Sequence, residues 1–137
     1  MATYGSEYYL HKSVVEYLQR LYPDAWFQSD RNGVNIPNIR TRALLRALQP
    51  HKGLDIFIAE PRQIDGCMYS GLFVELKLEV YGKSGYRLKN GDIAKNAHIQ
   101  EQWQTILRLR DKGYQADFAG GWDEAISLID GYLGGQF

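Results

Sequence analysis

The chain has 137 residues, of which 45% are hydrophobic and 13% aromatic, and this predicts a single globular domain over residues 1–137. Its 16 basic and 16 acidic residues leave no net charge, which argues against a protein that coats nucleic acid nonspecifically, and the single cysteine, Cys67, excludes an internal disulfide and a cysteine-based zinc site. Because no apolar run approaches the roughly 20 residues of a membrane span, and the first residues lack the apolar core of a signal peptide, we expect a cytoplasmic protein.

The first predicted element is a helix over residues 6–21. Its leucine and valine residues recur at helical spacing, and Ser6 stands where an N-cap is expected. Glu7 and His11 fall on the same stripe as Val14. A carboxylate in the first turn is favoured by the helix dipole, so the position of Glu7 alone does not imply a chemical role.

Two short elements and a group of cations follow. We expect a strand over 25–28 and a helix over 41–49 that carries apolar residues on one side and arginines on the other. Such a group of cations is either an ordinary solvated face or a surface for an anionic partner. The cations before the central stretch are Arg31, Arg40, Arg42, Arg46 and Lys52, and those after it are Lys83, Arg87, Lys89 and Lys95.

The central stretch predicts a hairpin with arms at 53–59 and 71–78. Alternation along both arms places Asp55, Glu75 and Lys77 on one face, opposite a face of aliphatic side chains. An Asp-Gly dipeptide, which favours a tight turn, lies between the arms. Folding the arms about this turn sets position 55 almost opposite position 75.

Opposed carboxylates on a half-buried sheet repel each other unless a cation or a shared proton lies between them. A magnesium or manganese ion with oxygen ligands is the simplest remedy. Lys77 would then stand beside the ion, where it could orient a water or neutralise charge on a phosphoryl group. The alternative is that Glu75 and Lys77 form a solvated pair on an exposed strand face, and strand patterns alone leave both possibilities open.

Residues 80–96 are rich in Gly, Lys, Ser and Asn without periodicity, and we expect a mobile loop that contacts a substrate. A helix is predicted over 97–112, with Gly113 after its end. Gln102 lies on the core-facing stripe of this helix, where an amide without a partner would be costly. The charged hairpin face is the candidate partner.

The last predicted elements are a strand over 114–118 and a helix over 123–133. Helices therefore alternate with short strands along the chain. This order predicts an α/β fold with a small mixed β-sheet flanked by helices.

The combination of Asp55, the tripeptide Glu75-Leu76-Lys77 and the helix bearing Gln102 resembles the PD-(D/E)xK nuclease superfamily. More narrowly, the chain resembles the small stand-alone VRR-NUC nucleases, which are often encoded in phage-like contexts. The similarity extends over nearly the whole chain. It implies a restriction-endonuclease-like core.

The resemblance also implies roles for individual residues. Asp55 and Glu75 would hold Mg²⁺ or Mn²⁺, and the backbone carbonyl of Leu76 would be a further ligand. Lys77 would assist the attacking water. Glu7 would complete or support the metal site from the first helix.

Gln102 is expected, by the same resemblance, to position the lysine, the water or the metal shell. Two residues depart from the family pattern. Leu54 replaces a proline before the first aspartate, which removes no ligand, and His11 replaces a common glutamine. We expect His11 to be packed or hydrogen-bonded and not to be a ligand.

These implications predict a metal-dependent endodeoxyribonuclease that hydrolyses phosphodiester bonds in branched DNA such as Holliday junctions. A symmetric homodimer would match a four-way junction. The alternatives are a catalytically inactive nucleic-acid-binding module of the same fold and a protein-interaction domain with solvated charges. The cations expected to bind DNA phosphates are Arg31, Arg40, Arg42, Lys83 and Lys89.

Overall fold

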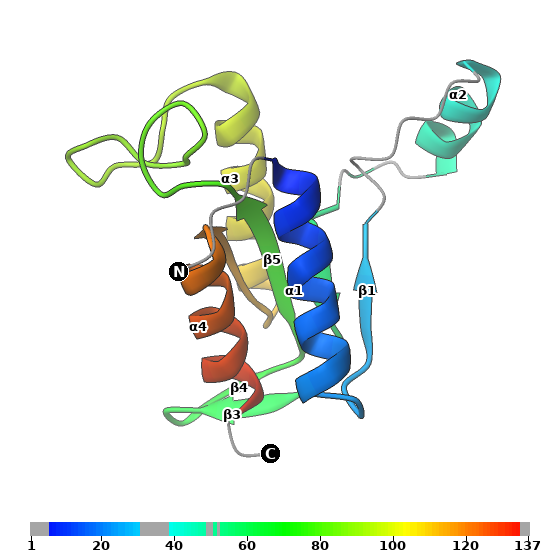
Figure 1. Ribbon diagram of the computed structural model, residues 1–137, viewed down its shortest axis with the longest axis vertical. Helices are drawn as coiled ribbons and strands as arrows, with labels where there is room; N and C mark the ends of the chain where they lie inside the picture. Colours follow the sequence, from blue (N-terminus) through cyan, green and yellow to red (C-terminus); the bar gives the residue numbers. More distant parts are fainter. Residues whose placement is uncertain (1–5, 31–38, 49–50, 52, 135–137) are drawn as a thin grey trace.

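The computed structural model describes residues 6–30, 39–48, 51 and 53–134 (Figure 1). Within these ranges, none of the helices combines the length and the apolar character that crossing a bilayer requires. The elements in chain order are α1 (Glu7–Leu21), β1 (Phe27–Ser29), α2 (Ile39–Leu48), β2 (Ile56–Ile58), β3 (Arg62–Ile64), β4 (Cys67–Tyr69), β5 (Leu72–Lys77), α3 (Ala97–Asp111), β6 (Gln115–Gly120) and α4 (Trp122–Leu133).

The main sheet has four strands in the order β1-β2-β5-β6. β1 and β2 are antiparallel, as are β2 and β5, whereas β5 and β6 are parallel. The predicted small mixed sheet flanked by helices is therefore confirmed. In the β2–β5 register Ile56 pairs with Val74, so one step back along β2 brings Asp55 opposite Glu75.

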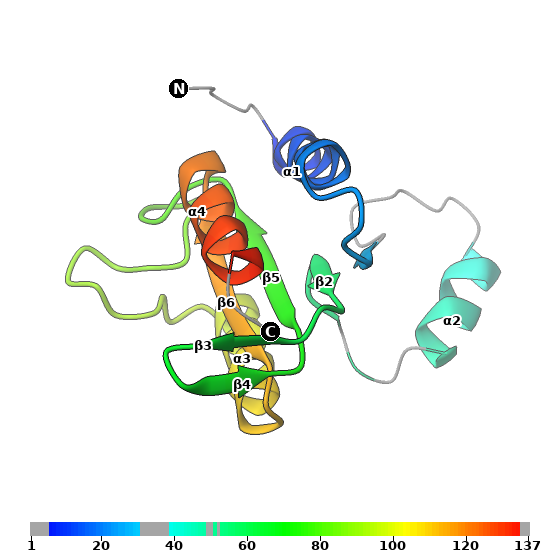
Figure 2. The same cartoon turned by 90° about the horizontal axis from the view of Figure 1, so that it is seen from below.

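The predicted turn is present, but it joins two strands that we did not expect. Asp65 and Gly66 both have positive φ, 51° and 82°, as a two-residue hairpin turn requires. They connect β3 and β4, which form a separate two-stranded sheet. This small sheet lies across the end of the main sheet, away from the C-terminal end of β5 (Figure 2). The chain therefore reverses direction at the β3–β4 turn, and β2 and β5 pair farther from that turn.

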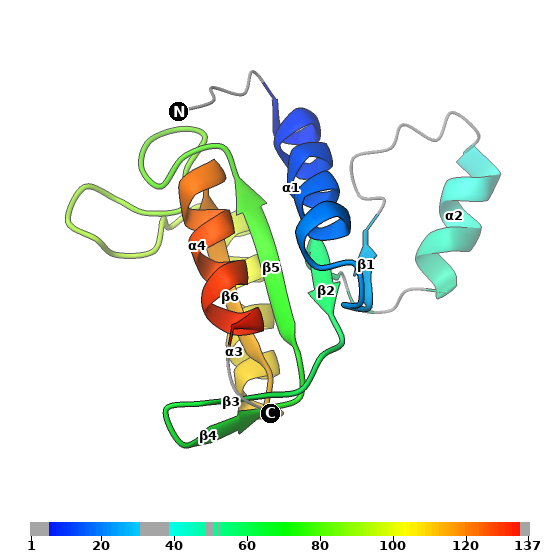
Figure 3. The same cartoon turned by 60° about the horizontal axis from the view of Figure 1, so that its bottom comes forward.

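Helices cover both faces of the main sheet, with α1 and α4 on one side and α3 on the other (Figure 3). The first face is packed with aliphatic side chains from α1, β2, β5 and α4, including Leu10, Leu18 and Val74, which are fully buried. A second core cluster includes Ile99 and Ile106 of α3. Since successive strand residues face opposite sides, Glu75 and Lys77 belong to the side of α3.

Side-chain hydrogen bonds join α1 and the residue after it to α4. The Asp130 carboxylate accepts hydrogen bonds from the hydroxyl groups of Tyr17, at 2.8 Å, and Tyr22, at 2.7 Å. At the start of α1, Ser6 occupies the N-cap position as expected, but its side chain makes no capping hydrogen bond. His11 is hydrogen-bonded as expected, with its Nε2 2.6 Å from the hydroxyl of Ser29.

The helix predicted over 41–49 forms as α2, but it stands apart from the rest of the molecule (Figure 1). Its apolar residues Ile39, Leu44 and Leu48 are 73%, 67% and 79% exposed. The pattern of apolar residues on one side was therefore correct for a helix, although these three side chains are not covered by the sheet.

The segment between β5 and α3 is an irregular loop, and one of its aromatic side chains is buried in the core. Tyr86 is buried, and its hydroxyl donates to Glu124 of α4 at 2.7 Å. The backbone N–H groups of Tyr86 and Arg87 both donate to the carbonyl of Val80. The expected irregular loop is therefore present, and an aromatic side chain joins it to the core.

Candidate active site

Three polar side chains are buried in the described part of the chain, and they lie together. Glu75, Lys77 and Gln102 are 5%, 6% and 6% exposed. Glu75 and Lys77 come from the C-terminal half of β5, and Gln102 comes from α3, which covers this face. The alternative of a solvated Glu75–Lys77 pair is therefore wrong, because solvation of both groups has been lost.

Asp55 enters the group from the residue just before β2. Its Oδ2 accepts a hydrogen bond from the backbone N–H of Leu76 at 2.8 Å, so a side chain extends the pairing with β5 by one residue before β2 begins. The N–H and C=O of one strand residue point to the same side. The carbonyl of Leu76 therefore faces the side on which Asp55 lies.

The electrostatics of Glu75 indicate an incomplete charge balance. Burial raises the pKa of the Glu75 carboxyl well above its usual range, the nearby Asp55 carboxylate raises it further, and the Lys77 ammonium lowers it. The Lys77 Nζ lies 4.0 Å from Glu75 Oε2, the limit of an ion pair. One ammonium at this distance does not offset burial and two facing carboxylates, so the site favours either a proton or a further cation.

Gln102 makes the contact that its position on the core-facing stripe predicted. Its Nε2 donates to Glu75 Oε2 at 3.0 Å and lies 3.2 Å from Nε2 of His98, one helical turn earlier. The amide oxygen, Oε1, is buried without a hydrogen-bond partner. A buried acceptor of this kind indicates a missing donor, such as a water molecule.

Glu7 lies in the exposed first turn of α1. Its charge contributes the smallest of the influences that raise the pKa of Glu75, so it is an electrostatic neighbour of the site. Among the described residues, no group of three or more His, Cys, Asp or Glu side chains is arranged to hold a metal ion. The carboxylates brought face to face are those of Asp55 and Glu75.

These two residues fit a hard divalent cation. Both offer carboxylate oxygens, and the carbonyl of Leu76 lies on the same side. Burial and the Asp55 carboxylate raise the pKa of Glu75, and a bound cation would oppose both effects. The buried Gln102 Oε1 adds an acceptor for a water molecule beside them.

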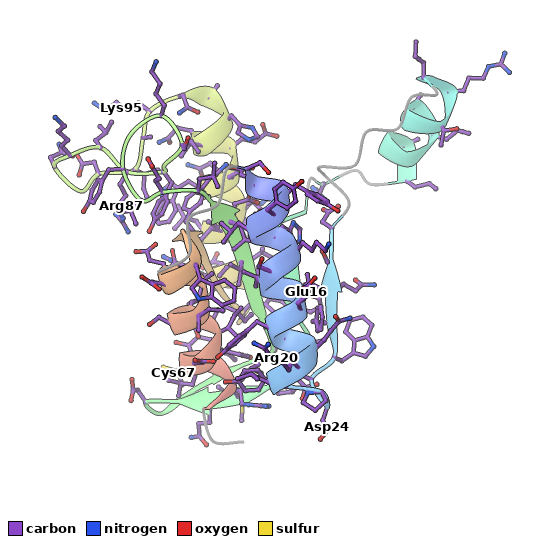
Figure 4. The ribbon with its side chains drawn as sticks, viewed as in Figure 1. Glu16, Arg20, Asp24, Cys67, Arg87 and Lys95 are labelled. Atoms are coloured by element: carbon purple, nitrogen blue, oxygen red, sulfur yellow. The ribbon has the colours of Figure 1, made fainter. Side chains whose placement is uncertain are left out.

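The predicted phosphate-binding cations are placed only in part. Lys83 and Lys89 are exposed on the loop that follows β5, near the end of the sheet that carries the site. Figure 4 shows Arg87 and Lys95 on the same loop. Arg40 is exposed on α2. Arg31 and the side chain of Arg42 lie outside the described residues.

Sequence reasoning missed His98, which contacts Gln102 directly. The available signal was its spacing, because residues four apart on a helix lie on the same face. It also missed Tyr86, whose burial fixes the loop beside the site.

The fold of this chain is similar to that of a protein of known structure. A structure described as a VRR_NUC domain protein superposes on this chain with a TM-score of 0.68, covering 98% of this chain and 93% of that chain at 18% sequence identity. The chain has the VRR-NUC fold. The resemblance inferred from the ordered motif residues is thus confirmed at the level of the fold. No protein-family model matches this sequence. No curated protein matches it either.

Within the VRR-NUC fold of this chain, the hairpin brings Asp55 to Glu75, and α3 closes over the pair with Gln102. This group combines two facing carboxylates with a buried ammonium.

Proposed function

We propose that the protein is a VRR-NUC nuclease that hydrolyses phosphodiester bonds of DNA with the help of a divalent metal ion, Mg²⁺ or Mn²⁺. The observation that carries this proposal is the buried pair of Glu75 and Lys77 at the C-terminal end of β5, with the partly buried Asp55 held beside them. A protein-interaction surface has no need to bury a carboxylate and an ammonium at a cost in solvation.

Asp55 and Glu75 are the proposed metal ligands, with the carbonyl of Leu76 beside them. Glu7 is proposed to support the site through its charge from the start of α1. When bound, the metal ion would supply Lewis-acid activation of a water and positive charge opposite the phosphoryl oxygens. The chain itself holds its ligands in place, because Asp55 is fixed by the Leu76 N–H and Glu75 by the Gln102 amide.

Lys77 is proposed to act on the phosphoryl group and the attacking water. Its ammonium is held inside the site near Glu75, where it would offset negative charge as this develops in the transition state. Because Lys77 is buried, water screens this charge less than it would on the surface. Gln102 is proposed to orient the water through its amide.

The proposed substrate is branched DNA of the Holliday-junction type. Lys83 and Lys89 on the loop after β5, and Arg31, Arg40 and Arg42 before or within α2, would contact backbone phosphates on either side of the site. A homodimer would present two such sites to a nearly two-fold symmetric junction. The exposed apolar residues of α2 supply a surface that a second copy could cover. Light scattering of the purified protein, with and without a junction, tests the dimer.

Cleavage of matched four-way, flap, single-stranded and duplex DNA with Mg²⁺, Mn²⁺ or a chelator tests the proposed function. We expect metal-dependent cleavage, fastest on the four-way junction, that is lost in Lys77→Ala and Asp55→Ala. Lys112→Ala is the matched control, since Lys112 is exposed at the opposite end of α3. Equal cleavage by all four proteins would refute the site. Junction binding without cleavage by the parent protein would favour an inactive binding module.

A further inference from the structure

His98 connects the surface of the molecule to the buried site. It lies in the first turn of α3 and is exposed, whereas Gln102, four residues later on the same helical face, is buried. The two side chains meet with their Nε2 atoms 3.2 Å apart. The same Gln102 nitrogen donates to Glu75 Oε2 at 3.0 Å. A continuous chain of contacts thus runs from His98 to a carboxylate of the site.

The Gln102 amide nitrogen carries two hydrogens, and each needs an acceptor in a buried place. Glu75 takes one. The geometry offers His98 Nε2 for the other, which requires the neutral imidazole with its proton on Nδ1. When the proposed cation keeps Glu75 ionised, this carboxylate accepts only, so turning the amide over would set its oxygen against a carboxylate oxygen. His98 and Glu75 together therefore specify one orientation of the amide.

We propose that His98 is a positioning residue that acts through Gln102, an inference that rests on the proposed nuclease function. By accepting the second amide proton, His98 fixes Gln102 so that Oε1 remains the free acceptor. This oxygen is buried without a partner among the described residues. It then accepts a hydrogen bond from a water molecule held beside Glu75 and Lys77, where the proposed hydrolysis needs its nucleophile.

Steady-state cleavage of the best junction substrate separates this role from a structural one. We expect His98→Leu to lower kcat about 10-fold, the effect of losing one orienting hydrogen bond, and to leave KM within about 2-fold. His98→Gln should restore most of kcat, because its side-chain oxygen can accept the same proton. Gln104→Leu, a polar-to-leucine change at an exposed position of the same helix, should match the parent protein.

The outcomes distinguish the two proposals. No cleavage by the parent protein would overturn the nuclease function itself. Cleavage by the parent with an unchanged His98→Leu variant, or an equal loss in His98→Leu and His98→Gln, would overturn the role of His98.

A second measurement needs neither metal nor substrate. The side-chain amide of Gln102 gives two proton signals in a nitrogen-15 correlation spectrum of the metal-free protein. We expect His98→Leu to shift one of these signals upfield and to speed its exchange with water, and His98→Gln to restore it. Two signals unchanged in His98→Leu would overturn the inference, whatever the kinetics show.

Discussion

The Asp55 carboxylate accepts a hydrogen bond from the backbone N–H of Leu76 at 2.8 Å, so one side chain both extends the pairing of β2 with β5 and faces Glu75. Asp55 therefore contributes to the fold and to the proposed site through different properties. Its carboxylate oxygen accepts the hydrogen bond that stabilises the strand pairing, and its negative charge would attract the proposed cation.

Substitutions of Asp55 should separate these two contributions. Asp55→Asn keeps an acceptor and removes a charge that repels Glu75, so we expect the metal-free variant to be at least as stable as the parent. Asp55→Ala leaves the Leu76 N–H without its partner and should lower the free energy of unfolding by about 1–3 kcal/mol. Urea unfolding in chelator measures both. Equal stability of the two variants would contradict the structural role of Asp55. In calorimetry, both variants should lose affinity for manganese.

Replacing Glu75 should raise the stability of the metal-free protein and abolish metal binding. Glu75→Gln keeps the shape of the side chain and removes a carboxyl that, buried beside Asp55, must either take up a proton or carry an unbalanced charge. We therefore expect a higher Tm than the parent without metal. Manganese should raise the Tm of the parent, because it binds the folded state, and should leave the Tm of the variant unchanged. A thermal scan with and without manganese checks this. An equal manganese-induced rise in both proteins would show that Glu75 is not a ligand.

The loop after β5 should contribute phosphate contacts. Lys83→Ala and Lys89→Ala should weaken junction binding, and each should reduce the slope of log K against log salt by about 1 if the lysine contacts one phosphate. Lys112→Ala serves as the control because it removes the same charge from the far end of α3. Binding titrations at several salt concentrations, in chelator to prevent cleavage, measure the slope. Identical slopes for all variants would exclude these lysines from the interface.

The link between α1 and α4 should make the protein sensitive to alkali. A hydrogen bond to Asp130, burial and the charge of this carboxylate raise the pKa of Tyr22 to about 12. Because the folded state holds this proton more tightly than the unfolded state, the contribution of Tyr22 to stability is complete below about pH 10 and is lost towards pH 12.

Tyr22→Phe should therefore flatten the fall in stability between these pH values, as measured by urea unfolding at closely spaced pH. The matched measurement is absorbance at 295 nm, in which Asp130→Asn should bring one late tyrosine ionisation to lower pH. An unchanged titration curve in Asp130→Asn would show that the Asp130 carboxylate does not cause the shift.

The loop beside the site should respond to a methyl group on Gly120. A Cβ there would lie 2.6 Å from the backbone of Glu79 and Val80, so Gly120→Ala must displace the start of the loop or the end of β6. We expect a clear loss of stability and weaker junction binding. Gly131→Ala is the control, because a Cβ at Gly131 meets nothing within 4 Å, and this change inside α4 should stabilise by about 0.5–1 kcal/mol. Equal effects of the two variants would contradict the close packing.

Local pattern determined much of this molecule. Alternation on the two arms of the hairpin, which has period two, was enough to place Asp55, Glu75 and Lys77 on one face and Asp55 opposite Glu75, because backbone geometry fixes the direction of each side chain in a strand. Helical spacing likewise put Gln102 on the buried stripe of α3. These features depend on residues near in sequence or joined by one turn.

Tertiary packing decided the rest. Only the placement of α3 over the strand face turned a charged pattern that could have been solvated into a buried group, and only that packing brought His98 to the Gln102 amide. Tyr86 anchors a loop that has no periodicity to reveal it, and α2 leaves apolar residues exposed although its pattern resembles that of a core helix. Burial depends on which surfaces meet, and local sequence spacing carries the direction of a side chain but not the identity of the surface that covers it.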